Sequence, residues 1–112
     1  IRRTMYSMRF SRNDVVLLPI PFSDLTSRKV RPAVVIGHNS RGDLFLVPIT
    51  SQPAGMDLSL GQWKSAGLNV PCGMKAQLAT VEERQVIKSI GQLADEDRDA
   101  LNAKLRDWLG LG

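Results

Sequence analysis

The sequence predicts a mainly β domain in which several short strands form a small barrel and one C-terminal helix closes it. Two observations indicate this class. Apolar runs of strand length follow one another between turn-forming residues, and only residues 95–112 carry apolar side chains at helical spacing. A chain of 112 residues buries about 60 to 70% of the surface of its unfolded form, which is enough for one core. We therefore expect residues 10–112 to form a single domain behind a flexible N-terminal arm at residues 1–9.

Three strands are expected in the first half of the chain. Residues 14–22 form the first apolar run, and two prolines near its end limit backbone hydrogen bonding and favour a sheet edge. Residues 32–37 and 44–50 form the next two runs, and a short polar turn with one glycine joins them as a hairpin. Residues 23–29, between the first two strands, are polar and basic, and we expect a mobile loop there.

The second half of the chain alternates loops with shorter elements. Residues 52–72 are rich in Gly and Pro and indicate a loop, after which residues 73–78 have the composition of a short strand. Thr80 is followed three residues later by a glutamate, a capping-box pattern that predicts a single helical turn. Residues 86–93 predict a further strand.

The C-terminal residues predict the one substantial helix. Asp95 is placed to cap it, and further acids crowd its first turns, where the helix dipole favours negative charge. Gly110 is placed to end it. The expected buried stripe consists of apolar side chains at helical spacing, namely Leu101, Leu105, Trp108 and Leu109.

The charge of the chain favours a polyanionic partner. The net charge is +4, but it is unevenly distributed. Residues 1–50 carry eight Lys and Arg against three Asp, a balance of +5, whereas residues 51–112 carry seven basic and eight acidic residues, a balance of −1. The cationic surface therefore belongs to the strand-rich half, which is where we expect nucleic acid to bind.

Several classes of protein do not fit this sequence. No apolar run approaches the ~18 residues that a membrane-spanning helix needs. The single Cys72 forms no internal disulfide, and no Cys/His cluster has zinc-ligand spacing. We therefore expect a cytoplasmic protein with no membrane contact, no metal site and no cofactor.

Two motifs at strand ends predict a phosphate-binding site. Arg31 precedes a proline, which favours extended backbone, and an apolar strand follows it. The strand at 44–50 ends in Thr50, with Ser51 and Gln52 directly after it. If both ends meet at one rim, they bring together a guanidinium, two hydroxyls and a carboxamide. The structural alternative is that these hydroxyls satisfy loop amides within a turn.

Several segments, in this order, resemble the MazF/PemK/Kid family of toxin endoribonucleases from bacterial toxin–antitoxin systems. They are the run Asp14-Val-Val-Leu-Leu-Pro-Ile-Pro-Phe-Ser-Asp24, the run Arg31-Pro-Ala-Val-Val-Ile36, the run Val47-Pro-Ile-Thr-Ser-Gln52, Lys75-Ala-Gln77 before Ala79-Thr-Val-Glu82, and the closing residues 90–97 with the helix after them. The resemblance covers roughly residues 10–110.

The resemblance implies a fold and a reaction. The fold would be an SH3-like β-barrel with a C-terminal helix, in a homodimer whose interface groove holds single-stranded RNA. Cleavage would be independent of metal, with the ribose 2′-hydroxyl attacking phosphorus to leave a 2′,3′-cyclic phosphate. A cognate antitoxin protein would neutralise the toxin, and an acidic, partly disordered tail suits the cationic groove.

The resemblance also implies roles for individual residues. Arg31 matches the arginine of the family's Arg-Pro motif and Thr50 its threonine at the end of the third strand, and these two are the predicted catalytic residues. The predicted RNA-binding residues are Arg28, Lys29, Ser51, Gln52, Lys75 and Gln77. Some members carry an aspartate at the position of Gln77, and because an amide cannot accept a proton as a base, the general base is unassigned. Asp24 and His38 are weak candidates for that role.

Two other functions stay open. CcdB shares the expected fold and inhibits DNA gyrase without cutting RNA, using the C-terminal end of its helix, so the segment Trp108-Leu109-Gly110-Leu111-Gly112 is the corresponding region here. A basic barrel that binds nucleic acid without chemistry is the third possibility. Trp63 and Trp108 lie among apolar neighbours in the sequence and are expected to pack in the core and not to stack on bases.

Overall fold

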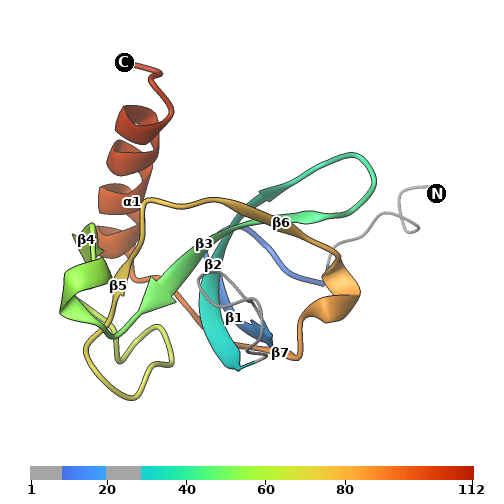
Figure 1. The fold of residues 1–112 in the computed structure, drawn as a ribbon, viewed down its shortest axis with the longest axis horizontal. Helices are drawn as coiled ribbons and strands as arrows, with labels where there is room; N and C mark the ends of the chain where they lie inside the picture. The colour runs from blue at the N-terminus through green and yellow to red at the C-terminus, as the bar shows by residue number, and fades with distance from the viewer. Residues whose placement is uncertain (1–8, 20–28) are drawn as a thin grey trace.

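The computed structural model describes residues 9–19 and 29–112 (Figure 1). Residues 1–8 of the expected N-terminal arm, the end of the first strand and most of the 23–29 loop, including Asp24 and Arg28, lie outside the described residues. The strands are β1 Asp14–Pro19, β2 Val30–His38, β3 Leu44–Thr50, β4 Leu58–Ser59, β5 Gly73–Met74, β6 Ala79–Val81 and β7 Lys88–Gln92. The helices are α1 Asp95–Trp108 and two 3-10 turns, η2 Pro53–Gly55 and η3 Glu83–Gln85.

The strands form one antiparallel sheet in the order β4-β5-β3-β2-β1-β7, with β6 also paired to β3. The mainly β class with a C-terminal helix is therefore confirmed. The expected closed barrel is corrected, because among the described strands no pairing joins β4 to β7. The free edge of β3 is divided between β6, which pairs with residues 44–46, and β5, which pairs with residues 49–50. Strands this short leave the sheet curved but open.

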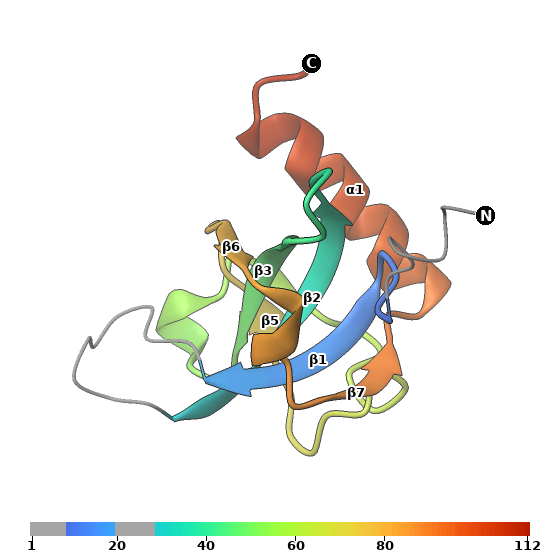
Figure 2. The same cartoon turned by 90° about the vertical axis from the view of Figure 1, so that its right-hand side faces the viewer.

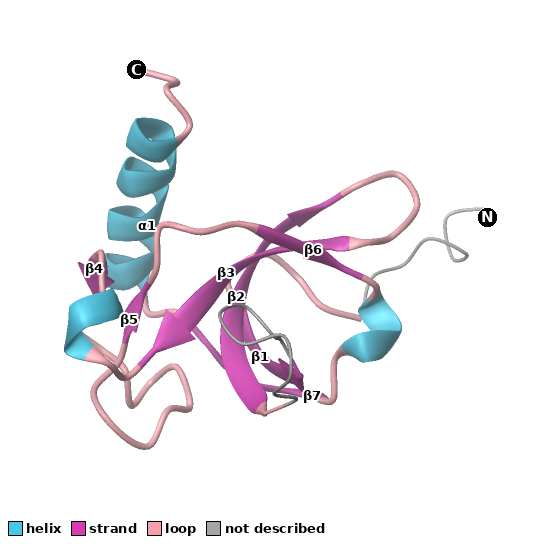
Figure 3. Ribbon diagram, viewed as in Figure 1, coloured by secondary structure: helices cyan, strands magenta, loops and turns pink. Residues whose placement is uncertain are grey.

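Alternate residues of the central strands feed two apolar clusters. One cluster contains Val34 and Val47 together with Leu101 and Leu105 of α1, and we call it the helix cluster. The other, which we call the opposite cluster, contains residues of the same strands and of β1. They include Ala33, Val35, Leu44, Leu46, Val16 and Leu18. This alternation follows from the two-residue period of a strand. Figures 2 and 3 show α1 beside the strands, where it covers only one of the two faces.

Several predicted elements differ in their bounds. The strand expected at 73–78 ends at Met74, because the chain then turns, with the backbone N–H of Gln77 donating to the carbonyl of Lys75 at 2.8 Å. Thr80 does not cap a helix and lies inside β6. The capping box is instead formed by Glu82 and Gln85, two residues later. The predicted strand at 86–93 is shorter, as β7.

The C-terminal helix is confirmed with two local corrections. Its N-cap is Ala94, whose side chain makes no capping bond, so Asp95 is the first helical residue and not the cap. Leu101 and Leu105 are buried as expected, whereas Leu109 is 49% exposed. Gly110 has φ +69°, the left-handed conformation that glycine adopts readily when it ends a helix. Within the described residues, no helix has the length and apolar character needed to cross a membrane.

Candidate nucleic-acid site

The candidate site lies where the start of β2 meets the end of β3. In these antiparallel strands Ala33 pairs with Pro48 and Val34 with Val47. Continuing this register by two residues sets Arg31 opposite Thr50. Residues opposite each other in an antiparallel pair project from the same face of the sheet. Arg31 and Thr50 both line the same two solvent-open pockets, so the structure brings the two predicted catalytic residues together.

The first of these hollows, which we call the cationic pocket, has a volume of about 310 Å³. Three cationic side chains line it, and among the described residues no carboxylate does. Such a pocket attracts a phosphate group, because three side chains give it positive charge. Its lining residues are Lys29, Arg31, Pro48, Ile49, Thr50, Gln52, Gly55 and Lys75.

A backbone hydrogen bond holds Lys75 at this pocket, although Lys75 is distant from Arg31 and Thr50 in the sequence. The N–H of Lys75 donates to the carbonyl of Pro48 at 3.1 Å, which ties the end of β5 to β3. Gly55, in the η2 turn, faces both functional side chains. A Cβ atom added there would lie 3.6 Å from the Thr50 methyl and 3.8 Å from Cε of Lys75. A side chain at position 55 would therefore contact both Thr50 and Lys75 at ordinary van der Waals distance.

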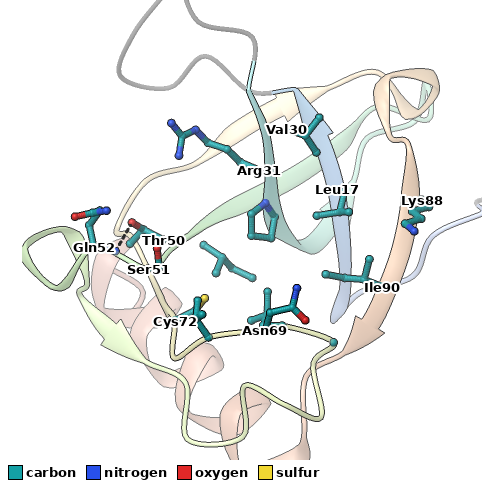
Figure 4. Close-up of a pocket in the computed structure, with 15 residues that line it drawn as sticks. Leu17, Val30, Arg31, Thr50, Ser51, Gln52, Asn69, Cys72, Lys88 and Ile90 are labelled. Carbon is teal, nitrogen blue, oxygen red and sulfur yellow. Dashed lines mark hydrogen bonds between the residues drawn. The ribbon is translucent and has the colours of Figure 1, made fainter.

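The Thr50 hydroxyl is oriented by its own turn. Its Oγ1 accepts a hydrogen bond from the backbone N–H of Gln52 at 3.0 Å (Figure 4). This is the turn that the structural alternative predicted, and it is compatible with a functional role. A hydroxyl has one donor and two acceptor positions, so accepting from Gln52 leaves the Thr50 proton available to a ligand in the pocket.

The second hollow, which we call the mixed pocket, has a volume of about 450 Å³. It lies beside the helix cluster, and apolar and polar side chains contribute about equally to its walls. It adjoins the cationic pocket, with which it shares Arg31, Ile49, Thr50 and Gln52. Its other lining residues are Leu17, Val30, Pro32, Ser51, Gly67, Leu68, Asn69, Val70, Cys72, Lys88 and Ile90.

The predicted RNA-binding residues divide into three groups. Lys29, Ser51, Gln52 and Lys75 line one or both pockets. Gln77 lines neither of them. Arg28 lies outside the described residues.

His38 is separated from the site along the length of β2, because it ends the strand that Arg31 begins. It lines a different hollow, beside Phe10 and Arg12. Within the described residues, no group of three or more His, Cys, Asp or Glu side chains has a geometry that would hold a metal ion.

Sequence analysis missed Asn69 and Lys88, which both line the mixed pocket. Asn69 lies in the loop between β4 and β5, and Lys88 begins β7. Neither belongs to a local motif, and both are far from Arg31 in the sequence, so only the fold reveals their proximity to it.

Cys72 also lines the mixed pocket, but its thiol is buried, at 6% exposure. Burial raises the pKa of the Cys72 thiol above its ordinary value of 9.0, because the apolar surroundings disfavour the thiolate. The protonated thiol is a poor nucleophile. The buried thiol of Cys72 is therefore assigned no part in the chemistry of the site.

Comparison with known proteins gives one family and a set of similar structures. The family model described as PemK-like, MazF-like toxin of type II toxin–antitoxin system matches residues 11–109. A solved endoribonuclease in complex with its cognate antitoxin, from a mycobacterial species, is 16% identical, with 94% of each chain covered and a TM-score of 0.67. A second mycobacterial endoribonuclease is 16% identical, with 92% of this chain and 94% of that chain covered and a TM-score of 0.65. At this identity the likeness shows the fold. No curated protein sequence matches the chain.

Proposed function

The chain belongs to the family of PemK-like, MazF-like toxins of type II toxin–antitoxin systems, and we propose that its toxic activity is endoribonucleolytic cleavage of single-stranded RNA. The family predicted from the sequence motifs is thereby confirmed. Two similar structures are named as endoribonucleases, and this supports the proposed activity.

The observation that carries the proposal is the convergence of Arg31 and Thr50 on a pocket that also contains Lys29 and Lys75. A guanidinium binds two phosphate oxygens at once through its planar fork, which a lysine cannot do. The two lysines add charge without fixed geometry. One cationic pocket therefore offers both orientation and attraction to an RNA phosphate.

We propose the following chemistry at this pocket. The ribose 2′-hydroxyl loses its proton to solvent water as its oxygen forms a bond to the adjacent phosphorus. The bond from phosphorus to the 5′-oxygen breaks and this oxygen takes up a proton from water, giving a 2′,3′-cyclic phosphate and a 5′-hydroxyl. Arg31 would stabilise the negative charge that develops on the phosphorane oxygens, and the Thr50 O–H would donate to one of these oxygens or to the leaving oxygen. Among the described residues, neither pocket is lined by a carboxylate or an imidazole. The pockets therefore supply positive charge and a hydroxyl donor, but no carboxylate or imidazole to act as general base for the 2′-hydroxyl.

The experiment is incubation of the purified protein with a mixed single-stranded RNA in the presence of EDTA. We expect fragments whose 5′ ends accept phosphate from polynucleotide kinase without prior phosphatase treatment, because they carry a free hydroxyl. A single 2′-deoxy substitution at a mapped cleavage site should block cleavage there. Intact RNA at every protein concentration, with the protein folded, would reject the proposal, and cleavage unaffected by the 2′-deoxy substitution would reject its chemistry.

A gyrase-directed toxin is the second candidate, because the end of the chain is exposed and apolar. Leu109 is 49% exposed and Leu111 is 61% exposed. Such a toxin would inhibit supercoiling by gyrase and leave RNA intact. The two assays on one preparation therefore separate the candidates, and binding of RNA with neither effect would favour the non-catalytic alternative.

We further propose that the toxin acts as a homodimer in the cytoplasm, where its RNA substrate is found. The C-terminal groove, defined by Arg12, Ile36, Phe45, Asn102, Leu105, Arg106, Leu109 and Leu111, has a volume of about 430 Å³. Its floor is apolar, and exposed apolar surface of this kind marks association sites. Light scattering should give twice the monomer mass, and Leu111→Glu should shift it toward monomer. A wild-type monomer at micromolar concentration would reject the dimer.

The antitoxin that we propose as a partner is an acidic protein segment. The similar mycobacterial structure is a complex with a cognate antitoxin, and the absence of carboxylates among the described residues that line the cationic pocket suits an acidic ligand. Such a segment should compete with RNA for the protein.

Residues 10–112 are proposed as one domain, in which Phe10 is already buried in the opposite cluster.

A further inference from the structure

We propose that the mixed pocket binds one nucleobase of the RNA beside the scissile phosphate, and that the side-chain amide of Asn69 selects which base it accepts. This inference rests on the proposed function, because it assigns part of the substrate to a second pocket next to the first. It adds a specificity-determining residue that no local sequence motif indicates.

The mixed pocket has the chemistry of a site for a nucleobase. Single-stranded RNA is recognised when unstacked bases rest their faces on protein surfaces and hydrogen-bond through their edges. The pocket offers apolar wall residues for the faces, including Pro32, Ile49 and Ile90, and an amide, Asn69, for an edge. Its volume of about 450 Å³ lies within the range of about 300 to 1,000 Å³ that is usual for small-molecule sites.

The two pockets are placed so that one nucleotide can occupy both. Arg31 and Thr50 project toward the face of the opposite cluster, since they share the alternation of Ala33. Ile49, one residue from Thr50, belongs to the helix cluster on the other face. The ends of β2 and β3 therefore form a wall between the pockets, with Arg31 and Thr50 lining both sides. A phosphate held by Arg31 leaves its neighbouring base free to enter the mixed pocket.

The backbone that carries Asn69 is held against β7 by close packing. Gly67 has φ +86°, and a Cβ atom there would lie 2.0 Å from the carbonyl oxygen of Ile90. A Cβ atom on Gly91 would likewise lie 2.5 Å from the carbonyl oxygen of Ala66. Only glycine allows the loop and the strand to approach this closely.

The residues around Asn69 add to this restraint. Leu68 is buried in the helix cluster, and its N–H donates to the carbonyl of Trp63 at 3.2 Å. Asn69 follows directly and is exposed. In Figure 4 it lies across the pocket from Arg31, in the part of the lining that also contains Ile90. An exposed polar side chain on a restrained backbone is suited to selecting a ligand, because little ordering is needed on binding.

The amide of Asn69 can recognise a base because it carries both a donor and an acceptor. Base edges present paired donors and acceptors, and an amide can bond two of these atoms at once. Lys88, on the same lining, adds a donor from β7.

The first experiment measures cleavage preference. Wild-type protein, Asn69→Ala and the matched control Gln62→Ala are incubated with a pool of random single-stranded RNA, and the cut ends are sequenced. Gln62 is an exposed amide in the same loop and lines neither pocket. We expect Asn69→Ala to relax the preference at one position next to the cut by about 10-fold, the scale of one lost bidentate contact, with Gln62→Ala unchanged. An unchanged preference in Asn69→Ala, or an equal loss of cleavage at all sequences, would overturn the inference.

The second experiment measures binding and does not depend on cleavage. A 2′-O-methyl RNA that cannot be cut is prepared with one abasic site at each position in turn. We expect the abasic site at one position to weaken binding to wild type and to Gln62→Ala by about 10-fold. The loss should be clearly smaller for Asn69→Ala, because this variant keeps only the apolar contacts to the base. If no position shows this pattern, the base-binding role of the mixed pocket is rejected. The endoribonuclease activity is tested separately by the cleavage assay. If the pattern appears but the wild type does not cut RNA, the endoribonuclease is rejected and the base pocket stands.

Discussion

Arg31 on β2 is the antiparallel partner of Leu18 on β1, a side chain with 0% exposure. The exposed guanidinium of Arg31 is therefore attached to backbone that pairs in the sheet next to the buried Leu18. This combination separates function from folding. The side chain can be changed without opening the core, while its backbone continues to pair.

Arg31→Ala should abolish toxicity and reduce RNA cleavage by about 10²- to 10³-fold, the usual effect of removing one donor to a developing oxyanion. Arg31→Lys should recover little, because an ammonium lacks the planar fork. Single-turnover cleavage assays measure the effect, and the melting temperature checks folding. Arg41→Ala is the control, since Arg41 lies in the β2–β3 turn in an exposed ion pair with Asp43 at 3.7 Å. A variant at position 31 that stays fully toxic, or one that unfolds, contradicts the assigned role.

Thr50→Val should reduce cleavage by about 10²-fold, whereas Thr50→Ser should retain most of it. Valine has nearly the same shape but no hydroxyl, so the variant loses the O–H donor and the acceptor for the N–H of Gln52. The lost hydrogen bond should cost at most about 1 kcal/mol of stability. Cleavage rates and urea unfolding separate these effects. Equal activity of the valine and serine variants would show that the hydroxyl has no part in the reaction.

Lys75→Ala should weaken binding of uncleavable single-stranded RNA and make its salt dependence shallower. Each phosphate contact contributes about 0.7 to the slope of log binding constant against log salt for single strands, so we expect the slope to fall by about 0.7. Titrations at several KCl concentrations give the slope. Lys64→Ala is the control, since Lys64 lines neither pocket. A uniform loss of affinity with an unchanged slope would place Lys75 away from the RNA.

The stability of the protein should contain a component from Cys72 that is lost at high pH. Burial raises the pKa of the folded thiol above its ordinary value of 9.0, so folding favours the protonated form. The contribution is fully present below pH 9.0, where both states are protonated, and it falls as the pH rises and the unfolded thiol ionises. Urea unfolding of wild type and Cys72→Ala between pH 7 and 10.5 measures it. The difference in stability between the two should shrink above pH 9.0, and a constant difference would contradict the prediction.

Asp97→Ala should destabilise the fold by about 2 to 3 kcal/mol. This carboxylate is 5% exposed, and its two oxygens accept the backbone N–H groups of Gly61 at 2.9 Å and Gln62 at 2.8 Å. The variant leaves these two N–H groups, which belong to the loop that carries Asn69, without a partner. Thermal unfolding gives the loss, with the exposed Asp99→Ala as the control. Equal stability of the two variants would show that the hydrogen bonds from the loop to Asp97 do not stabilise the fold.

Much of the architecture follows from local patterns. The apolar run at 44–50 and the helical spacing after Asp95 each predict an element that the structure contains, because side-chain periodicity reports which face of a strand or helix is buried. The Arg-Pro and Thr-Ser motifs likewise indicate the family and the first two residues of the candidate site. The bounds of these elements were less predictable where pairing with another strand competed with a local motif. Thr80, for example, lies in β6 and pairs with Phe45 of β3 instead of capping a helical turn.

Contacts between distant segments decided the rest. The pairing of Ala33 with Pro48 brings Arg31 and Thr50 to one face, and a slip of one residue in that register would turn one of them away. Asn69 reaches the same region only because Gly67 lets its loop touch β7. The open edge of the sheet likewise depends on how β5 and β6 share β3. Such contacts join residues far apart in the chain, so no window of neighbouring residues contains both partners.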